Sequence, residues 1–190
     1  MLLSAVKMAL AMCLLACMAQ SARAQDHSLT VYGGFVTKDT WLEALSLNTI
    51  FVDAQILVCA WSWTVKRYHE GALTLEVEGQ AARYFGLQDH LELNFPLALR
   101  WHRFPWDSAV DTSMAFGLGP SWAAEDPKVE LMTHDSTSQL LVYWFLEIAL
   151  GPPSADWAGV FRLHHRSTGF GTVARDGGSN TLAAGVKFLF

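Results

Sequence analysis

The chain carries the segment FRLHHRS at residues 161–167 and the closing segment NTLAAGVKFLF at residues 180–190. We interpret them as two β-strands joined by a loop over residues 168–179. Successive side chains of a strand point to opposite faces. One face of the first strand therefore carries Arg162, His164 and Arg166, and the other carries Phe161, Leu163, His165 and Ser167. Both strands have an apolar side and a polar side, which is typical of a sheet with two different environments.

Residues 1–24 have the features of a secretory signal peptide. Lys7 precedes the apolar run Met8–Met18, and Ala22-Arg23-Ala24 forms a cleavage site of the A-x-A type. Cys17 resembles a lipoprotein processing site, but the A-x-A site that follows it favours ordinary cleavage. We therefore expect one domain over residues 25–190, in which Cys59 is the single cysteine and forms no disulfide framework.

The composition favours a membrane environment without a membrane helix. The formal net charge is −5, which offers no basic surface for nucleic acid, so nucleic acid is excluded as a partner. Apolar residues make up 52% of the chain. Yet the longest apolar run, Leu140–Leu150, is short of the roughly 20 residues that a spanning helix needs, and it contains Glu147. Strands of about ten residues suffice for a membrane barrel.

Eight segments show strand-like alternation and are separated by turns rather than by long helices. We expect an all-β fold, an eight-stranded antiparallel transmembrane β-barrel, because closing such a meander removes the exposed edges. Pro96 is the weak point, since proline donates no ladder hydrogen bond. The expected strands cover residues 28–36, 50–63, 72–84, 90–104, 111–122, 137–150, a seventh that contains 161–167, and 180–190.

The alternative is a soluble sandwich or lipocalin-like barrel, which would turn its apolar face inward. We favour the membrane barrel because the polar face carries bulky groups of both signs, which can pair in a narrow, charge-filled lumen. Glu76 and Glu78 are expected to pair with Arg100, Arg162 or Arg166. The expected lumen groups are Asp53, Glu76, Glu78, Glu92, Arg100, His102, Glu147, Arg162, His164, Arg166 and Lys187. In the second strand, Val52, Ala54, Ile56, Val58 and Ala60 are expected to face outward.

Turn lengths predict the orientation. The turns after the second, fourth and sixth strands are short, whereas those after the first, fifth and seventh are longer. Outer-membrane barrels keep short turns in the periplasm. His165 and Ser167 should then lie at the extracellular end, with Trp63, Trp106 and Trp157 at the lower rim and Trp122 at the upper rim.

His165 and Ser167 are the exception on the apolar face. Two residues along a strand span about 6.6 Å, so an imidazole can lean toward the hydroxyl and activate it as a nucleophile. The alternative is that both residues simply lie in the headgroup zone, where polar side chains are tolerated. His164 and His165 face opposite ways and cannot share a metal ion, so we expect no metal and no cofactor.

The segment 162–167, the glycine-bearing loop after it and Lys187 in the last strand resemble the end of the lipid A 3-O-deacylase family. That family consists of eight-stranded outer-membrane barrels that remove an ester-linked acyl chain from lipid A with Ser, His and Glu on the outer face. The resemblance implies an outer-membrane location, lipid A or lipopolysaccharide of the outer leaflet as partner, and Ser167 and His165 as catalytic residues.

The chain departs from the family at two positions. The family's acidic residue falls on Asn180, which cannot stabilise an imidazolium as a carboxylate does, and its Asn after the Ser is Thr168. Asp176 in the loop is a candidate substitute acid. The second hypothesis is therefore a non-catalytic small outer-membrane barrel with a structural or surface-interaction role.

Overall fold

The computed structural model describes residues 26–46 and 49–190. The expected signal peptide lies outside them. Within these ranges no helix is long and apolar enough to span a membrane. The strands are β1 (His27–Thr37), β2 (Phe51–Tyr68), β3 (Leu73–Gly86), β4 (Leu91–Asn94), β5 (Leu97–Trp101), β6 (Asp111–Ala123), β7 (Leu140–Gly151), β8 (Trp157–Ser167) and β9 (Gly178–Leu189); the short helices are α2 (Trp41–Leu45), η1 (His69–Gly71) and η2 (Glu130–Met132).

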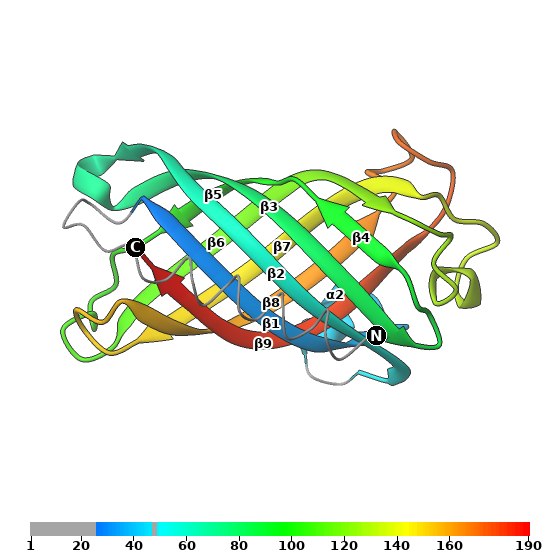
Figure 1. Ribbon diagram of the computed structural model, residues 1–190, viewed down its shortest axis with the longest axis horizontal. Helices are drawn as coiled ribbons and strands as arrows, with labels where there is room; N and C mark the ends of the chain where they lie inside the picture. The colour runs from blue at the N-terminus through cyan, green and yellow to red at the C-terminus, as the bar shows by residue number, and fades with distance from the viewer. Residues whose placement is uncertain (1–25, 47–48) are drawn as a thin grey trace, which may run out of the picture.

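The strands form a closed antiparallel ring. Consecutive strands pair with each other except β4 and β5, and β1 pairs with both β2 and β9, which closes the sheet (Figure 1). β4 and β5 both lie between β3 and β6, so together they form one of eight positions in the ring. This confirms the predicted eight-stranded antiparallel barrel.

Pro96 interrupts the fourth position of the ring, as the sequence predicts. The ladder continues around it, because Glu78 N–H donates to the Pro96 carbonyl over 3.0 Å and Phe95 N–H donates to the Pro120 carbonyl over 3.1 Å. Gly119 of β6 lies directly against this break, and a Cβ there would overlap the Phe95 carbonyl oxygen and Pro96 Cα. The interruption divides the strand without opening the barrel.

The barrel turns its apolar side chains outward and its ionisable groups inward. Leu97, Met114 and Phe161 are about half exposed on the outer wall, whereas Glu78, Glu147 and Arg162 are at most 2% exposed. The burial of side chains alternates along β3 to β7 as the sequence predicts. In β8 and β9 the alternation is broken, because Leu163 and Asn180, predicted on the outward face, are 3% and 6% exposed.

The predicted facing of β2 is wrong. Ala54, Ile56, Val58 and Ala60 point into the lumen, where they pack with Tyr32, and Asp53 is exposed on the outside. The reason is that β2 is apolar on both faces, since Leu57, Trp61 and Trp63 line the outer wall. The lumen therefore contains an apolar cluster beside β1 and β2 as well as charged groups.

Ion pairs fill the rest of the lumen. Arg162 donates to Glu147 over 2.8 Å and to Glu78 over 2.7 Å, and its guanidinium lies 3.9 Å from the ring centroid of Phe145. Lys187 donates to Glu147 over 2.7 Å. These contacts join β3, β7, β8 and β9 across the barrel, as expected for a plugged interior.

The two ends of the barrel differ. The turns at 69–72, 102–110 and 152–156 lie at the end that holds the C-terminus, and the loop segments at 38–46, 49–50, 87–90, 124–139 and 168–177 lie at the other end (Figure 1). We call them the terminal end and the loop end. β8 runs toward the loop end, so Ser167 lies there.

Candidate active site

His165 and Asn180 face each other across the β8–β9 ladder. They are directly paired in register, and His165 Nδ1 lies 2.6 Å from Asn180 Oδ1. An amide oxygen only accepts hydrogen bonds, so the ring donates through Nδ1–H. The neutral imidazole then carries its lone pair on Nε2, the tautomer that a general base requires.

The amide of Asn180 is itself held in orientation by the loop after β1. Asn180 Nδ2 donates to the Asp39 carbonyl over 2.8 Å, which turns Oδ1 toward His165. The Asp39 carboxylate accepts from the Thr49 hydroxyl over 2.7 Å and from the backbone N–H of Ile50. These bonds, with that of Ile50 first, lower the pKa of Asp39 from its usual value. A closed loop therefore supports the histidine partner.

Aromatic rings cover one face of His165. The Trp144 ring centroid lies 4.3 Å from the imidazole centroid, and Trp41 packs edge-on against Trp144 at 6.0 Å. Trp41 opens α2, whose first turn is fixed by a capping box between Thr40 and Glu43. The imidazole is therefore confined between the β9 partner and an aromatic wall.

Ser167 shares a pocket of about 380 Å³ with His165 and Asn180, and Lys38 and His134 also line it. Within the described residues the Ser167 hydroxyl makes no hydrogen bond, so Ser167 and His165 are not hydrogen-bonded to each other in this structure. β9 approaches Ser167 closely, because a Cβ at Gly178 would lie 2.7 Å from the Arg166 carbonyl oxygen and 3.3 Å from Ser167 Cα. Because the Ser167 hydroxyl has no hydrogen bond to break, it can turn toward a substrate.

Glu130, which the sequence analysis missed, fixes the loops behind the pocket. It lies in η2, is fully buried, and binds Arg166 over 3.0 Å and the Ser179 hydroxyl over 3.3 Å. Burial raises the pKa of its carboxyl, and Arg166 opposes that rise. In sequence Glu130 looks like any acid of a polar loop, so no local pattern could have identified it.

Asp176, the candidate substitute acid, is bonded elsewhere. Its carboxylate accepts from the backbone N–H of Asp135 over 2.9 Å and of Gly177 over 3.0 Å. Thr168 accepts from the Gly171 N–H over 3.1 Å and so shapes the loop after Ser167. The partner of His165 in this structure is Asn180. The described residues contain no group of three His, Cys, Asp or Glu side chains that could hold a metal ion.

A shallow apolar groove lies on the same outer wall. It has a volume of about 480 Å³, and Gly33, Phe35, Phe161, Leu182 and Ala184 line it. Leu182 and Ala184 follow Asn180 by two and four residues on the same face of β9, which is about 6.6 and 13 Å along the strand. The groove therefore begins next to the pocket and runs toward the middle of the barrel.

Two solved structures share this architecture. The outer membrane enzyme PagL matches with a TM-score of 0.61 and 12% identity, over 85% of this chain and 98% of that chain. The fold is that of a small outer-membrane β-barrel. Neisserial surface protein A (NspA) also matches, with a TM-score of 0.54 and 13% identity, over 88% of this chain and 98% of that chain. No protein-family model matches the chain, and no curated protein sequence matches it.

Proposed function

We propose that residues 1–24 direct the chain out of the cytoplasm and that residues 25–190 form an outer-membrane barrel with esterase activity. Its substrate is an ester-linked acyl chain of lipid A in the outer leaflet, and the reaction uses no metal and no cofactor. Ser167 is the nucleophile, His165 the general base and Asn180 the residue that orients the imidazole. The observation that carries this proposal is the hydrogen bond from His165 Nδ1 to Asn180 Oδ1.

The reaction follows from this tautomer. His165 Nε2 takes the proton of Ser167 as the Oγ attacks the ester carbonyl, and it returns that proton to the departing alkoxide. Water then attacks the acyl-enzyme, again with His165 as base, and releases a fatty acid and free Ser167. A neutral amide serves as the third member of Cys-His-Asn proteases. Asn180 can therefore hold the ring, although it stabilises the imidazolium less than a carboxylate does.

The surroundings of the pocket suit a lipid ester. The pocket lies at the loop end, between the loop after β1 and the ends of β8 and β9, where an outer-leaflet lipid would present its ester groups. The apolar groove that begins at Leu182 offers room for the acyl chain. Lys38 lines the pocket beside the Asp39 carboxylate and can donate to an anionic headgroup.

A non-catalytic barrel with a structural or surface role is the second candidate. It is favoured by the Ser167 hydroxyl, which does not bond to His165 among the described residues. It is also compatible with the shared fold of Neisserial surface protein A.

The test is to reconstitute the folded barrel with lipopolysaccharide and to follow the mass of lipid A. The esterase predicts loss of one acyl chain with the wild type and no loss with Ser167→Ala. Ser154→Ala, which removes a hydroxyl from the opposite end of the barrel, should behave as the wild type. Unchanged lipid A with a folded wild-type barrel would contradict the esterase and favour the second candidate.

A further inference from the structure

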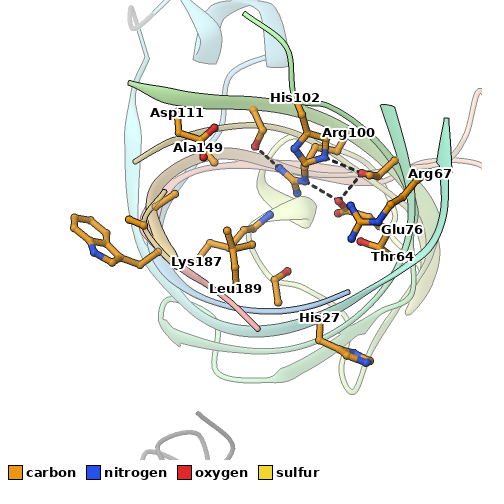
Figure 2. Close-up of a pocket in the computed structure, with 16 residues that line it drawn as sticks. His27, Thr64, Arg67, Glu76, Arg100, His102, Asp111, Ala149, Lys187 and Leu189 are labelled. Atoms are coloured by element: carbon orange, nitrogen blue, oxygen red, sulfur yellow. Dashed lines mark hydrogen bonds and ion pairs between the residues drawn. The ribbon is translucent and has the colours of Figure 1, made fainter. Parts of the chain in front are cut away.

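A second cavity opens in the lumen at the terminal end, far from Ser167. It has a volume of about 290 Å³ and is lined by polar groups of β2, β3, β5, β6 and β9 (Figure 2). Glu76, Arg100 and His102 form one wall. Lys187 reaches in from another. The proposed esterase uses none of these groups.

One atom of Arg100 and one of Glu76 on this wall have no hydrogen-bond partner among the described residues. Arg100 and Glu76 are 3% and 5% exposed, and they pair through Arg100 Nε and Glu76 Oε1 at 2.9 Å. Arg100 Nη1 reaches Glu147 at 2.9 Å and Ser113 at 3.2 Å. Within the described residues, Arg100 Nη2 and Glu76 Oε2 make no hydrogen bond. Both residues line the cavity, and the two unbonded atoms lie just behind its surface, each with less than 1 Å² of accessible area. Buried polar atoms are costly unless they are hydrogen-bonded.

The neighbouring His102 is not the hydrogen-bond partner of either atom. The Thr74 hydroxyl donates to Glu76 Oε1 over 3.0 Å, so it accepts from His102 Nε2, which lies 3.0 Å away. Burial, together with the nearby Arg100, lowers the pKa of His102 to about 4, so the ring is neutral at pH 7. His102 therefore adds no charge to the cavity wall.

The charges around the cavity select the ligand. Three carboxylates, Glu76, Glu78 and Glu147, are joined in one network to three cations, Arg100, Arg162 and Lys187, so its formal charge is zero. Arg67 and Asp111, which also line the cavity, add one formal charge of each sign. A lone anion or cation would leave this buried network with an uncompensated charge. A molecule that carries one positive and one negative group would leave the formal charge of the network at zero.

We propose that this cavity binds a zwitterionic group of the amino-acid type. A small side-chain rotation of Arg100 and Glu76 turns both atoms into the cavity. The carboxylate of the ligand then accepts from Arg100 Nη2, with Lys187 nearby, and its ammonium donates to Glu76 Oε2. Both orphaned atoms then gain charge-assisted hydrogen bonds, and the charge balance of the lumen is unchanged.

The test uses glycine as the probe and the folded barrel in a maltoside detergent, which carries no zwitterionic headgroup. Glycine should shift the amide resonances of Glu76 and Arg100 saturably, and those of the loop 168–177 should not move. Glycine methyl ester lacks the carboxylate, and N-acetylglycine lacks the ammonium. Each should bind weaker by about tenfold or more, as expected for one lost charge-assisted contact. Absence of saturable shifts with glycine, or equal binding of either analogue, overturns the proposal.

A filled cavity provides a second measurement. Ala158 lines the cavity, so Ala158→Leu should abolish the glycine shifts, whereas Ala81→Leu on the outer wall should leave them unchanged. Undiminished binding in a folded Ala158→Leu barrel overturns the site. If that variant does not fold, the comparison of glycine with glycine methyl ester and N-acetylglycine on the wild-type barrel still tests the proposal. Ser167→Ala should bind glycine like the wild type, which separates this site from the esterase.

Discussion

Asn180 decides how the proposed site works, because it is the hydrogen-bond partner of His165 where the resembled family has an acid. The strand period of two predicted that His165, Ser167 and Asn180 share the outer face, and the structure pairs His165 with Asn180. The support from Asp39 could not be predicted, because Asp39 is 141 residues from Asn180 in sequence. The contact of Trp144 with His165 depends on the register of β8 against β7, and that of Glu130 with Arg166 depends on the fold of the loop before β7. No local sequence pattern gives either one.

Removing the Asn180 amide should slow the proposed reaction without preventing lipid binding. In Asn180→Ala the imidazole loses the side-chain hydrogen bond at Nδ1 and is no longer held in the tautomer with the lone pair on Nε2. Mispositioning of this kind in a Ser triad lowers kcat by up to about 10⁴. Single-turnover deacylation should show the loss in kcat with little change in KM. A loss confined to KM would instead indicate that Asn180 binds the lipid.

The bonds of Asp39 to Thr49 and Ile50 predict a weak acid sensitivity of the backbone at residues 49–50. Its pKa lies below the usual value in the folded loop, so its bonds to Ile50 and Thr49 contribute order above about pH 4. That order is lost as the pH falls through the lowered pKa. The Ile50 amide should therefore exchange faster, relative to its intrinsic rate at the same pH, below about pH 4 in the wild type. In Asp39→Asn the Ile50 amide should exchange close to its intrinsic rate at every pH. The same pH-dependent protection as in the wild type would contradict this role of the Asp39 carboxylate.

At the scale of single strands, the alternation of side chains was predictive wherever only one face is apolar. β3 has Glu76 and Glu78 on one face and leucines on the other, so its facing was predicted correctly. β2 has apolar residues on both faces, and the period of two cannot then tell inside from outside. The lumen needs small side chains beside Tyr32, and Ala54 and Ala60 supply them.

The break at Pro96 predicts a strict requirement for glycine at 119. Gly119→Ala should destabilise the barrel, because its Cβ would overlap the Phe95 carbonyl and Pro96 Cα, and backbone cannot easily move aside. Gly79→Ala is the matched control, since its Cβ would meet only the Phe95 ring at an ordinary 3.9 Å. Urea unfolding in lipid vesicles should show a lower midpoint for Gly119→Ala alone. Equal midpoints for the two variants would mean that the backbone at Phe95 and Pro96 moves aside to accept the Cβ.

At the scale of the whole molecule, the charge pattern predicted both the barrel and its filled lumen. Individual ion pairs were only partly predictable. Arg162 was expected to meet Glu76 or Glu78, and it binds Glu78 and Glu147. The choice depends on which strands face each other across the lumen. That arrangement follows from the register of the closed ring and not from any one segment.

Arg162→Leu should destabilise the barrel strongly. It leaves Glu78 and Glu147 in the lumen without their shared guanidinium, and breaking a buried pair costs about 3–5 kcal/mol. Arg83→Leu removes an arginine from an exposed pair with Asp89, which is worth about 0–1 kcal/mol. Heat-modifiable gel migration and urea unfolding should separate the two variants. Equal stability would argue against a tightly packed interior.

The bond from Arg162 to Glu78 also constrains how the protein can be assembled. The two residues lie 84 positions apart, on β8 and β3, and bond through the lumen. A half-built sheet would expose both charges to hydrocarbon, so single hairpins should not persist as inserted intermediates. Insertion and closure should thus be one concerted step, slowed by its long-range pairing. Two separately made halves should enter a bilayer only when mixed.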